Sequence, residues 1–145
     1  MTSINLNTSI TINAPAEKVW KAIVDPAVVE KYFFGTQQLS DFKKGSEIVW
    51  TGVWDGKTYR DHGNILDIVP GSYLQYSYWS SMGGLPDIPE NYQTVTYNLS
   101  EADGVTTMLI SQDNVKSEAA KEHSEANWQY IFGQMTDMIE RGQVD

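Results

Sequence analysis

The clearest periodic pattern lies near the C-terminus. Its apolar residues recur at helical spacing and fall in one sector of the helix, with polar residues opposite. They are Trp128, Ile131, Phe132, Met135, Met138 and Ile139. Ser117 is a typical N-cap and Gly142 a typical residue after a C-terminus, which predicts one helix over residues 117–141. Charges surround the helix before Trp128, so we expect its second half to pack on a sheet and its first half to overhang an opening.

The N-terminal pattern predicts a strand followed by two short helices. Apolar and polar residues alternate over residues 4–13, with one ambiguous point near Thr8. Residues 16–24 have helical spacing and end at Asp25-Pro26, because the residue before a proline avoids the helical conformation and proline lacks a donor. Pro26 then opens a second short helix that runs to Tyr32.

The middle of the chain alternates between strand patterns and turns. The predicted strands cover residues 36–40, 46–54, 57–69, 73–79, 92–101 and 105–112. Asp55-Gly56 is the strongest hairpin signal, since both turn positions require positive φ. No helix separates these strands, which indicates an antiparallel sheet. The loop over residues 80–91 contains Gly83-Gly84, and its length predicts a mobile lid.

Together these elements predict an α+β fold in a single domain over residues 1–145. A curved antiparallel sheet of about six or seven strands surrounds the long C-terminal helix. The two short helices after the first strand close one end. The space between sheet and helix is a natural ligand pocket.

Composition excludes several classes of function. The formal net charge is −9, which argues against binding nucleic acid or an anionic membrane surface. The chain has no cysteine, so disulfides and thiolate chemistry are absent. No apolar run is long enough to span a membrane, and no signal peptide is recognisable. We therefore expect a cytoplasmic location and no membrane insertion.

Few residues point to catalysis. His62 is the candidate for acid–base chemistry, but its neighbour Asp61 points to the opposite face of the same strand and cannot orient it. His123 lies on the polar half of the last helix. Metal-binding, dinucleotide and P-loop patterns do not occur, so we expect neither a metal nor a cofactor. Whether the protein is an enzyme stays open, with binding favoured.

An unusual number of aromatic residues predicts the wall of the pocket. Trp50 and Trp54 share parity with Ile48 and should face inward together, because Glu47 on the opposite parity belongs in water. We expect His62 to be a polar tip near this wall. Mid-helix Gly133 indicates a close approach to the sheet or to a ligand. The predicted ligand-binding residues are Trp50, Trp54, His62, Tyr76, Tyr78, Met108, Trp128 and Phe132.

Several segments resemble the START-like, helix-grip (SRPBCC) superfamily, and within it the homologues of the activator of heat-shock-protein-90 ATPase. They are residues 10–23, Asp25-Pro26, and residues 63–70, 74–79, 106–112 and 128–132. Tyr32 replaces a usual tryptophan and Asn127 a usual glycine, and both changes could reshape the pocket. The resemblance implies a helix-grip domain of a kind that binds lipids, sterols, polyketides or other apolar molecules, with no shared catalytic residues.

Three functions follow from this resemblance. The first is binding of a small hydrophobic, aromatic or lipid-like molecule between the sheet and the C-terminal helix. The second is a chaperone-regulator-like protein-interaction module, with a chaperone as partner. The family's chaperone regulators use an additional domain, for which this chain has no room, so its length favours binding. A cyclase or dehydratase type of enzyme is the least favoured.

Overall fold

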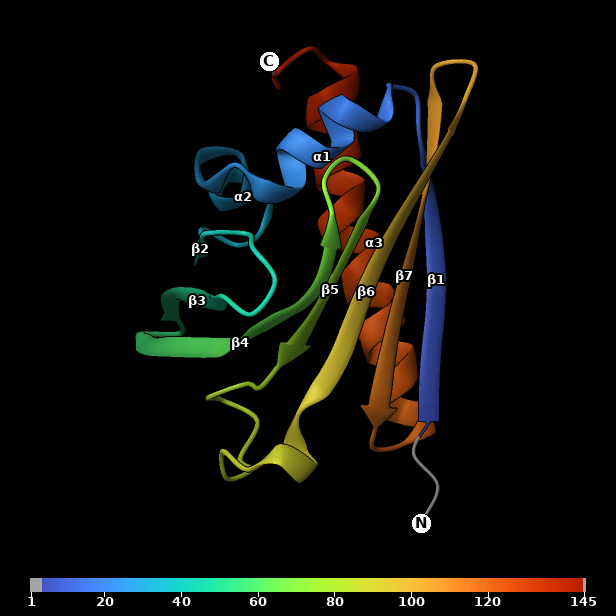
Figure 1. The fold of residues 1–145 in the computed structure, drawn as a ribbon. Helices are drawn as coiled ribbons and strands as arrows, with labels where there is room; N and C mark the ends of the chain where they lie inside the picture. Colours follow the sequence, from blue (N-terminus) through green and yellow to red (C-terminus); the bar gives the residue numbers. More distant parts are fainter. Residues whose placement is uncertain (1–3, 145) are drawn as a thin grey trace.

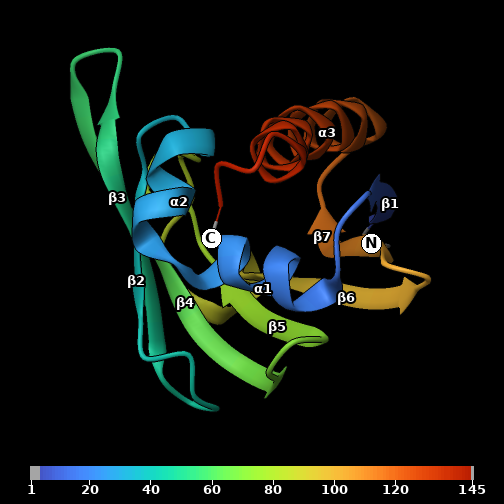
Figure 2. The same cartoon turned by 90° about the horizontal axis from the view of Figure 1, so that it is seen from above.

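Seven antiparallel strands form one sheet in the computed structural model, which describes residues 4–144. Across the sheet the order is β1-β7-β6-β5-β4-β3-β2. In chain order the elements are β1 (Ile4–Ile12), α1 (Ala16–Val24), α2 (Pro26–Tyr32), β2 (Gln37–Ser40), β3 (Glu47–Trp54), β4 (Lys57–Val69), β5 (Tyr73–Tyr78), η1 (Pro89–Asn91), β6 (Gln93–Ala102), β7 (Val105–Val115) and α3 (Glu118–Glu140). The sheet curves around α3, and α1 and α2 cover one end of the groove (Figures 1 and 2). The predicted α+β helix-grip fold is confirmed.

Strand β4 joins the two parts of the sheet. Residues 57–64 pair with β3, whereas the strand pairs with β5 from Ile65 onward, with a register shift before Asp67. At the change-over, a Cβ on Gly63 would lie 1.6 Å from the carbonyl oxygen of Ser77. Glycine therefore permits the close approach of β5, and the bulge bends the strand. As a result β2 and β3 form the side of the groove that lies across from α3, as Figure 2 shows.

The predicted turn at Asp55-Gly56 and the predicted cap at Ser117 are both present. Asp55 and Gly56 have φ of 52° and 77°, the positive values that a two-residue hairpin turn requires. Asp25 ends α1 and caps α2, where its side chain accepts a hydrogen bond from the amide of Ala27 at 3.0 Å. In the same way Ser117 accepts from the amide of Ala120 at the start of α3.

Helix α3 buries the predicted apolar stripe against the concave face of the sheet. Ile131, Phe132, Met135 and Ile139 are buried, while Trp128 and Met138 are partly buried beside them. Gly142 has φ of 74° and follows the end of the helix, as expected. The core therefore fills the half of the groove nearest α1 and α2. Within residues 4–144 no helix has both the length and the apolar character of a membrane span.

Strand β1 runs without interruption at the point that the sequence left ambiguous. Its register with β7 is continuous from Leu6 to Ile12, and the irregularity lies earlier, between Ile4 and Leu6. Leu6 and Ile12 are fully buried, so the residues of even number face the core. The strong alternation thus determines the face of β1 despite the polar residues within it.

Candidate functional site

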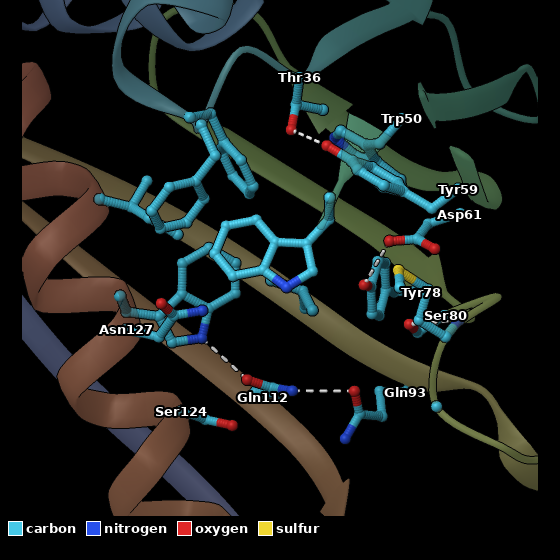
Figure 3. A pocket seen from close by; sticks show the side chains of 18 of the residues that line it. Thr36, Trp50, Tyr59, Asp61, Tyr78, Ser80, Gln93, Gln112, Ser124 and Asn127 are labelled. Atoms are coloured by element: carbon cyan, nitrogen blue, oxygen red, sulfur yellow. Dashed lines mark hydrogen bonds between the residues drawn. The ribbon is translucent and has the colours of Figure 1, made fainter. Parts of the chain in front are cut away.

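A cavity of about 770 Å³ lies between the sheet and the first half of α3. This volume is within the range of small-molecule pockets, roughly 300 to 1,000 Å³. Its apolar lining is mostly aromatic. From the segment after α2, from β3 and from α3 it includes Phe33, Phe34, Trp50, Trp54, Trp128 and Ile131, and β5 and β6 add Tyr76 and Val95. Ser124 and Asn127 from the polar half of α3 complete the wall (Figure 3). The overhanging half of the helix thus covers a hollow.

Trp50 forms the rigid part of the sheet wall. Its side chain is only 4% exposed, and its ring packs against Tyr76 and Tyr78 with centroids 5.1 and 5.3 Å apart. The indole nitrogen donates to Oε1 of Gln38 at 2.9 Å, and Nε2 of Gln38 donates to the carbonyl of Ile23 at 2.7 Å. These bonds tie the indole to α1 and hold it in one orientation.

Trp128 holds the opposite side of the cavity. Its ring stacks on Phe132 with centroids 5.5 Å apart and planes 4° apart. Its indole nitrogen donates to Oε1 of Gln112 at 2.8 Å, and Nε2 of Gln112 donates to Oε1 of Gln93 at 2.9 Å (Figure 3). A strip of amides therefore crosses β6 and β7 below the helix.

Asp61 is the only carboxylate among the described lining residues. Its Oδ2 accepts from the hydroxyl of Tyr78 at 2.9 Å, and its Oδ1 accepts from the amide and the hydroxyl of Ser81 at 2.9 and 3.0 Å. Burial raises the pKa of Tyr78 above its usual range, and the neighbouring Asp61 raises that pKa further. Tyr78 therefore stays protonated and acts as a donor. Nearby, the hydroxyls of Thr36 and Tyr59 share a hydrogen bond.

Five of the eight residues predicted for the site surround the cavity. They are Trp50, Trp54, Tyr76, Tyr78 and Trp128. Trp54 shares the inward parity of Trp50, yet it is 56% exposed, because β3 runs past the covered part of the groove. Met108 and Phe132 are buried in the core and do not line the cavity. Any role of these residues in binding stays a prediction.

His62 lies on the other face of the sheet, which corrects the expectation that it lies at the pocket wall. It is opposite Val49, whereas Asp61 is opposite the inward-facing Trp50. Its Nε2 lies 2.8 Å from Oδ2 of Asp87, and its ring meets that of Trp79 edge-on. Because neighbouring strand residues alternate between faces, only one of Asp61 and His62 can reach the cavity.

Sequence reasoning missed several polar lining residues. They are Thr36, Tyr59, Asp61, Gln93 and Gln112, whereas the sequence connects Asn127 with the pocket only through the resemblance. A signal existed for two of them. Asp61 shares parity with the buried Ile65, and Gln112 shares parity with the buried Met108 and Ile110. A polar residue on the inward parity of a strand indicates a wall that faces a cavity rather than packed core.

The described residues suggest no metal centre. Within residues 4–144, no three His, Asp or Glu side chains lie close enough together to hold a metal ion. Every buried side-chain nitrogen or oxygen described has a hydrogen-bond partner in the protein. The cavity therefore offers shape, aromatic faces and a few fixed polar groups.

Residues 13–140 match the sequence model of the family described as activator of Hsp90 ATPase homolog 1-like protein. Among solved structures, ChR145 from Cytophaga hutchinsonii is 42% identical, with a TM-score of 0.84 and coverage of 96% of this chain and 95% of that one. No curated protein sequence matches this chain.

Two more distant structures share the fold. PFC0360w, an Hsp90 activator from Plasmodium falciparum, is 15% identical, with a TM-score of 0.73 and coverage of 94% of this chain and 96% of that one. DynU16, from the dynemicin biosynthetic locus, is 18% identical, with a TM-score of 0.77 and coverage of 95% of this chain and 48% of that one. At these identities the likeness concerns the fold alone.

Proposed function

The chain belongs to the activator of Hsp90 ATPase homolog 1-like family, and on that premise we propose that it binds a small hydrophobic molecule with a flat, aromatic body. The site is the cavity between the sheet and α3. The observation that carries the proposal is a hollow of about 770 Å³ with Trp50 on one side and Trp128 on the other. At the rim of this hollow Phe34 and Trp54 are 44% and 56% exposed, and a ligand that covers them removes apolar surface from water.

The polar groups of the wall support a specific ligand rather than a nonspecific apolar one. Trp50 and Trp128 are each held by a glutamine, so their rings need no ordering when a ligand enters. Less conformational entropy is then lost on binding. Gln93, which hydrogen bonds hold to Gln112 and Asn114, and Asn127 add polar groups to the wall. A ligand with one or two polar substituents on a planar body fits this arrangement best.

The test combines identification of the ligand with binding in solution. Native mass spectrometry of the purified protein should show a co-purified small molecule. Fatty acids, sterols and aromatic polyketides are then compared by tryptophan quenching and thermal melting. A true ligand quenches fluorescence and raises Tm as its concentration exceeds Kd.

A matched pair of variants locates the site. Ser124→Phe places a ring in the cavity and should abolish quenching by the ligand, whereas Ala126→Phe adds the same ring at an exposed position of α3 outside the cavity and should leave quenching unchanged. Equal binding by both variants would place the ligand elsewhere. A panel without any effect on Tm, together with no co-purified molecule, would reject the proposal.

One observation favours a second function, a protein-interaction module of the chaperone-regulator kind. Phe34 and Tyr130 stack at the surface with centroids 5.7 Å apart, and Trp54 packs edge-on against Phe34. Phe34 is 44% exposed, and Trp54 and Tyr130 are each 56% exposed. Clustered exposed aromatic residues are typical of interaction sites. Purified Hsp90 bound by the wild type but not by Phe34→Ser would support this function.

A further inference from the structure

The permanent charge that lines the cavity is negative. Asp61 is its only carboxylate, and no lysine or arginine lines it in the part of the chain that the structure describes. Among the described lining residues, His123 on α3 is the only one whose side chain can carry a positive charge. The whole chain carries a formal net charge of −9. An anionic ligand would thus enter a negative field without a cation to meet it, and a cationic ligand would be attracted.

The carboxylate of Asp61 is fixed but not saturated. Its Oδ1 accepts two hydrogen bonds, both from Ser81, at 2.9 and 3.0 Å. Its Oδ2 accepts only one, from the hydroxyl of Tyr78 at 2.9 Å. A carboxylate oxygen has about two acceptor positions, so Oδ2 keeps one for a further donor. The donors already in place hold the carboxylate still, and a ligand would not have to order it.

Aromatic rings surround this carboxylate. Trp50 is directly opposite Asp61 in the register of β3 and β4, and Tyr59 is the next residue on the same face of β4. Tyr78 lies beside it and donates to it (Figure 3). Ring faces attract cations through their quadrupoles, and the effect strengthens when the cation is removed from water. Carboxylate and rings therefore favour the same kind of ligand.

We infer that the cavity selects amines: its ligand carries a protonated amino group that donates to Oδ2 of Asp61 while its flat apolar part lies between Trp50 and Trp128. The inference rests on the proposed function and narrows its ligand class. It also excludes free fatty acids and other carboxylates, whose charge would meet that of Asp61.

Three ligands that share a naphthalene ring and differ in the charge of their substituent test the inference by isothermal titration calorimetry. They are 2-naphthylmethylamine, 2-naphthalenemethanol and 2-naphthoate. The wild type should bind the amine about tenfold more tightly than the alcohol, as one charge-assisted hydrogen bond contributes, and should bind the naphthoate most weakly.

The variant Asp61→Asn removes the charge and keeps the shape, with an acceptor for Ser81 and an amide that can donate to Tyr78. It should bind amine and alcohol about equally, with the affinity for the alcohol unchanged. Asp67→Asn is the control: it removes the same charge from an exposed position of β4 outside the cavity and should keep the preference for the amine. Circular dichroism of each variant verifies that the fold is retained.

The outcomes separate the two proposals. If amine and alcohol bind wild type equally, or if Asp61→Asn keeps the preference, the selection of amines is overturned while binding in the cavity stands. Tightest binding of the naphthoate also overturns it. If none of the three ligands binds the wild type, the proposed binding of flat aromatic molecules fails, and the inference fails with it.

Discussion

At the scale of single residues, two glycines have opposite meanings. Gly63 allows the backbone of β5 to approach β4, since a Cβ there would lie 1.6 Å from the carbonyl oxygen of Ser77. Gly133 in α3 has no atom within 4 Å of the position of a Cβ. The expected close approach of Gly133 to the sheet is therefore wrong, whereas its approach to a ligand stays a prediction. The sequence gives the positions of both glycines within their strand or helix, but only the atoms around each one in the folded structure show why glycine is needed or not needed there.

Gly63→Ala should destabilise the protein strongly. The added methyl group overlaps a backbone atom, which cannot rotate away as a side chain could, so β5 must shift and lose hydrogen bonds to β4. We expect a loss of roughly 3 kcal/mol or more, measured as the free energy of unfolding in urea. A midpoint close to that of the wild type would show that the two strands separate easily at this point.

Gly133→Ala should stabilise the protein by about 0.5 to 1 kcal/mol, because alanine has the higher helix propensity and the space for its methyl group is free. Thermal melting followed by circular dichroism measures the effect. A lower Tm would mean that the glycine is needed for a contact, such as one with a ligand, that the free protein does not make.

At the scale of elements, the loop over residues 80–91 was predicted to be a mobile lid. Ser80, Met82 and Gly83 do lie at the cavity. The second part of the loop is fastened: Asp87 accepts from the hydroxyl of Tyr92 and pairs with His62, and the indole of Trp79 donates to the carbonyl of Pro86. Its mobility stays a prediction, and we expect the motion to be largest over residues 82–85, where the amides of Met82 and Gly83 make local hydrogen bonds to Ser80.

Asp87→Asn should loosen the loop. It weakens the pair with His62, so amide hydrogen exchange should become faster over residues 80–91 and stay unchanged in β6. Exchange unchanged by the substitution would show that the bond from Trp79 to Pro86 suffices to hold the loop.

Acid should act on the same contact. Hydrogen bonds from Tyr92, and then from His62, lower the pKa of Asp87. Because the pKa of Asp87 is lower in the folded state, its negative charge stabilises the loop at pH values above the unfolded-state pKa, which is near 4. This contribution is lost as the pH falls through the folded-state pKa. We therefore expect the loop to open below about pH 4, with a smaller effect in Asp87→Asn. Limited proteolysis with an acid-active protease measures this opening, and equal cleavage of both proteins would contradict it.

At the scale of the whole molecule, the buried tyrosines should determine stability in alkali. Burial raises the pKa values of Tyr32, Tyr76, Tyr78 and Tyr97 above their usual range. Each tyrosine with a raised pKa contributes its full stabilisation at pH values below the unfolded-state pKa, about 10. This contribution decreases as the pH rises from there toward the folded-state pKa. The free energy of unfolding should therefore fall above pH 10, by about 1.4 kcal/mol per pH unit for each such tyrosine.

Urea unfolding at a series of pH values between about 8 and 11 measures this slope by circular dichroism. Tyr32→Phe should reduce the slope above pH 10 by the share of one tyrosine, because its hydroxyl donates only to the carbonyl of Ala22 and leaves no other side chain unpaired. A slope that this substitution does not change would show that Tyr32 ionises in the folded state.

The local sequence contained most of the fold and part of the site. Periodicity, caps and the Asp55-Gly56 turn determined the type and order of the elements, because each depends on residues close in the chain. The same two-residue turn places Trp50 opposite Asp61, so the outward position of His62 was implied by the sequence although the prediction did not use it. Sequence alone therefore determined which residues share a face.

Tertiary structure alone decided what those faces meet. Trp54 has the inward parity of Trp50 yet lies at the rim, because the curvature of the sheet, set at Gly63, decides how far α3 covers β3. Ser81 donates to Asp61 although it is 20 residues away in the sequence, a contact that no local pattern indicates. Parity is a local property with a period of two residues, whereas the cavity arises from the distance between a bent sheet and a helix far away in the sequence, which no local pattern encodes.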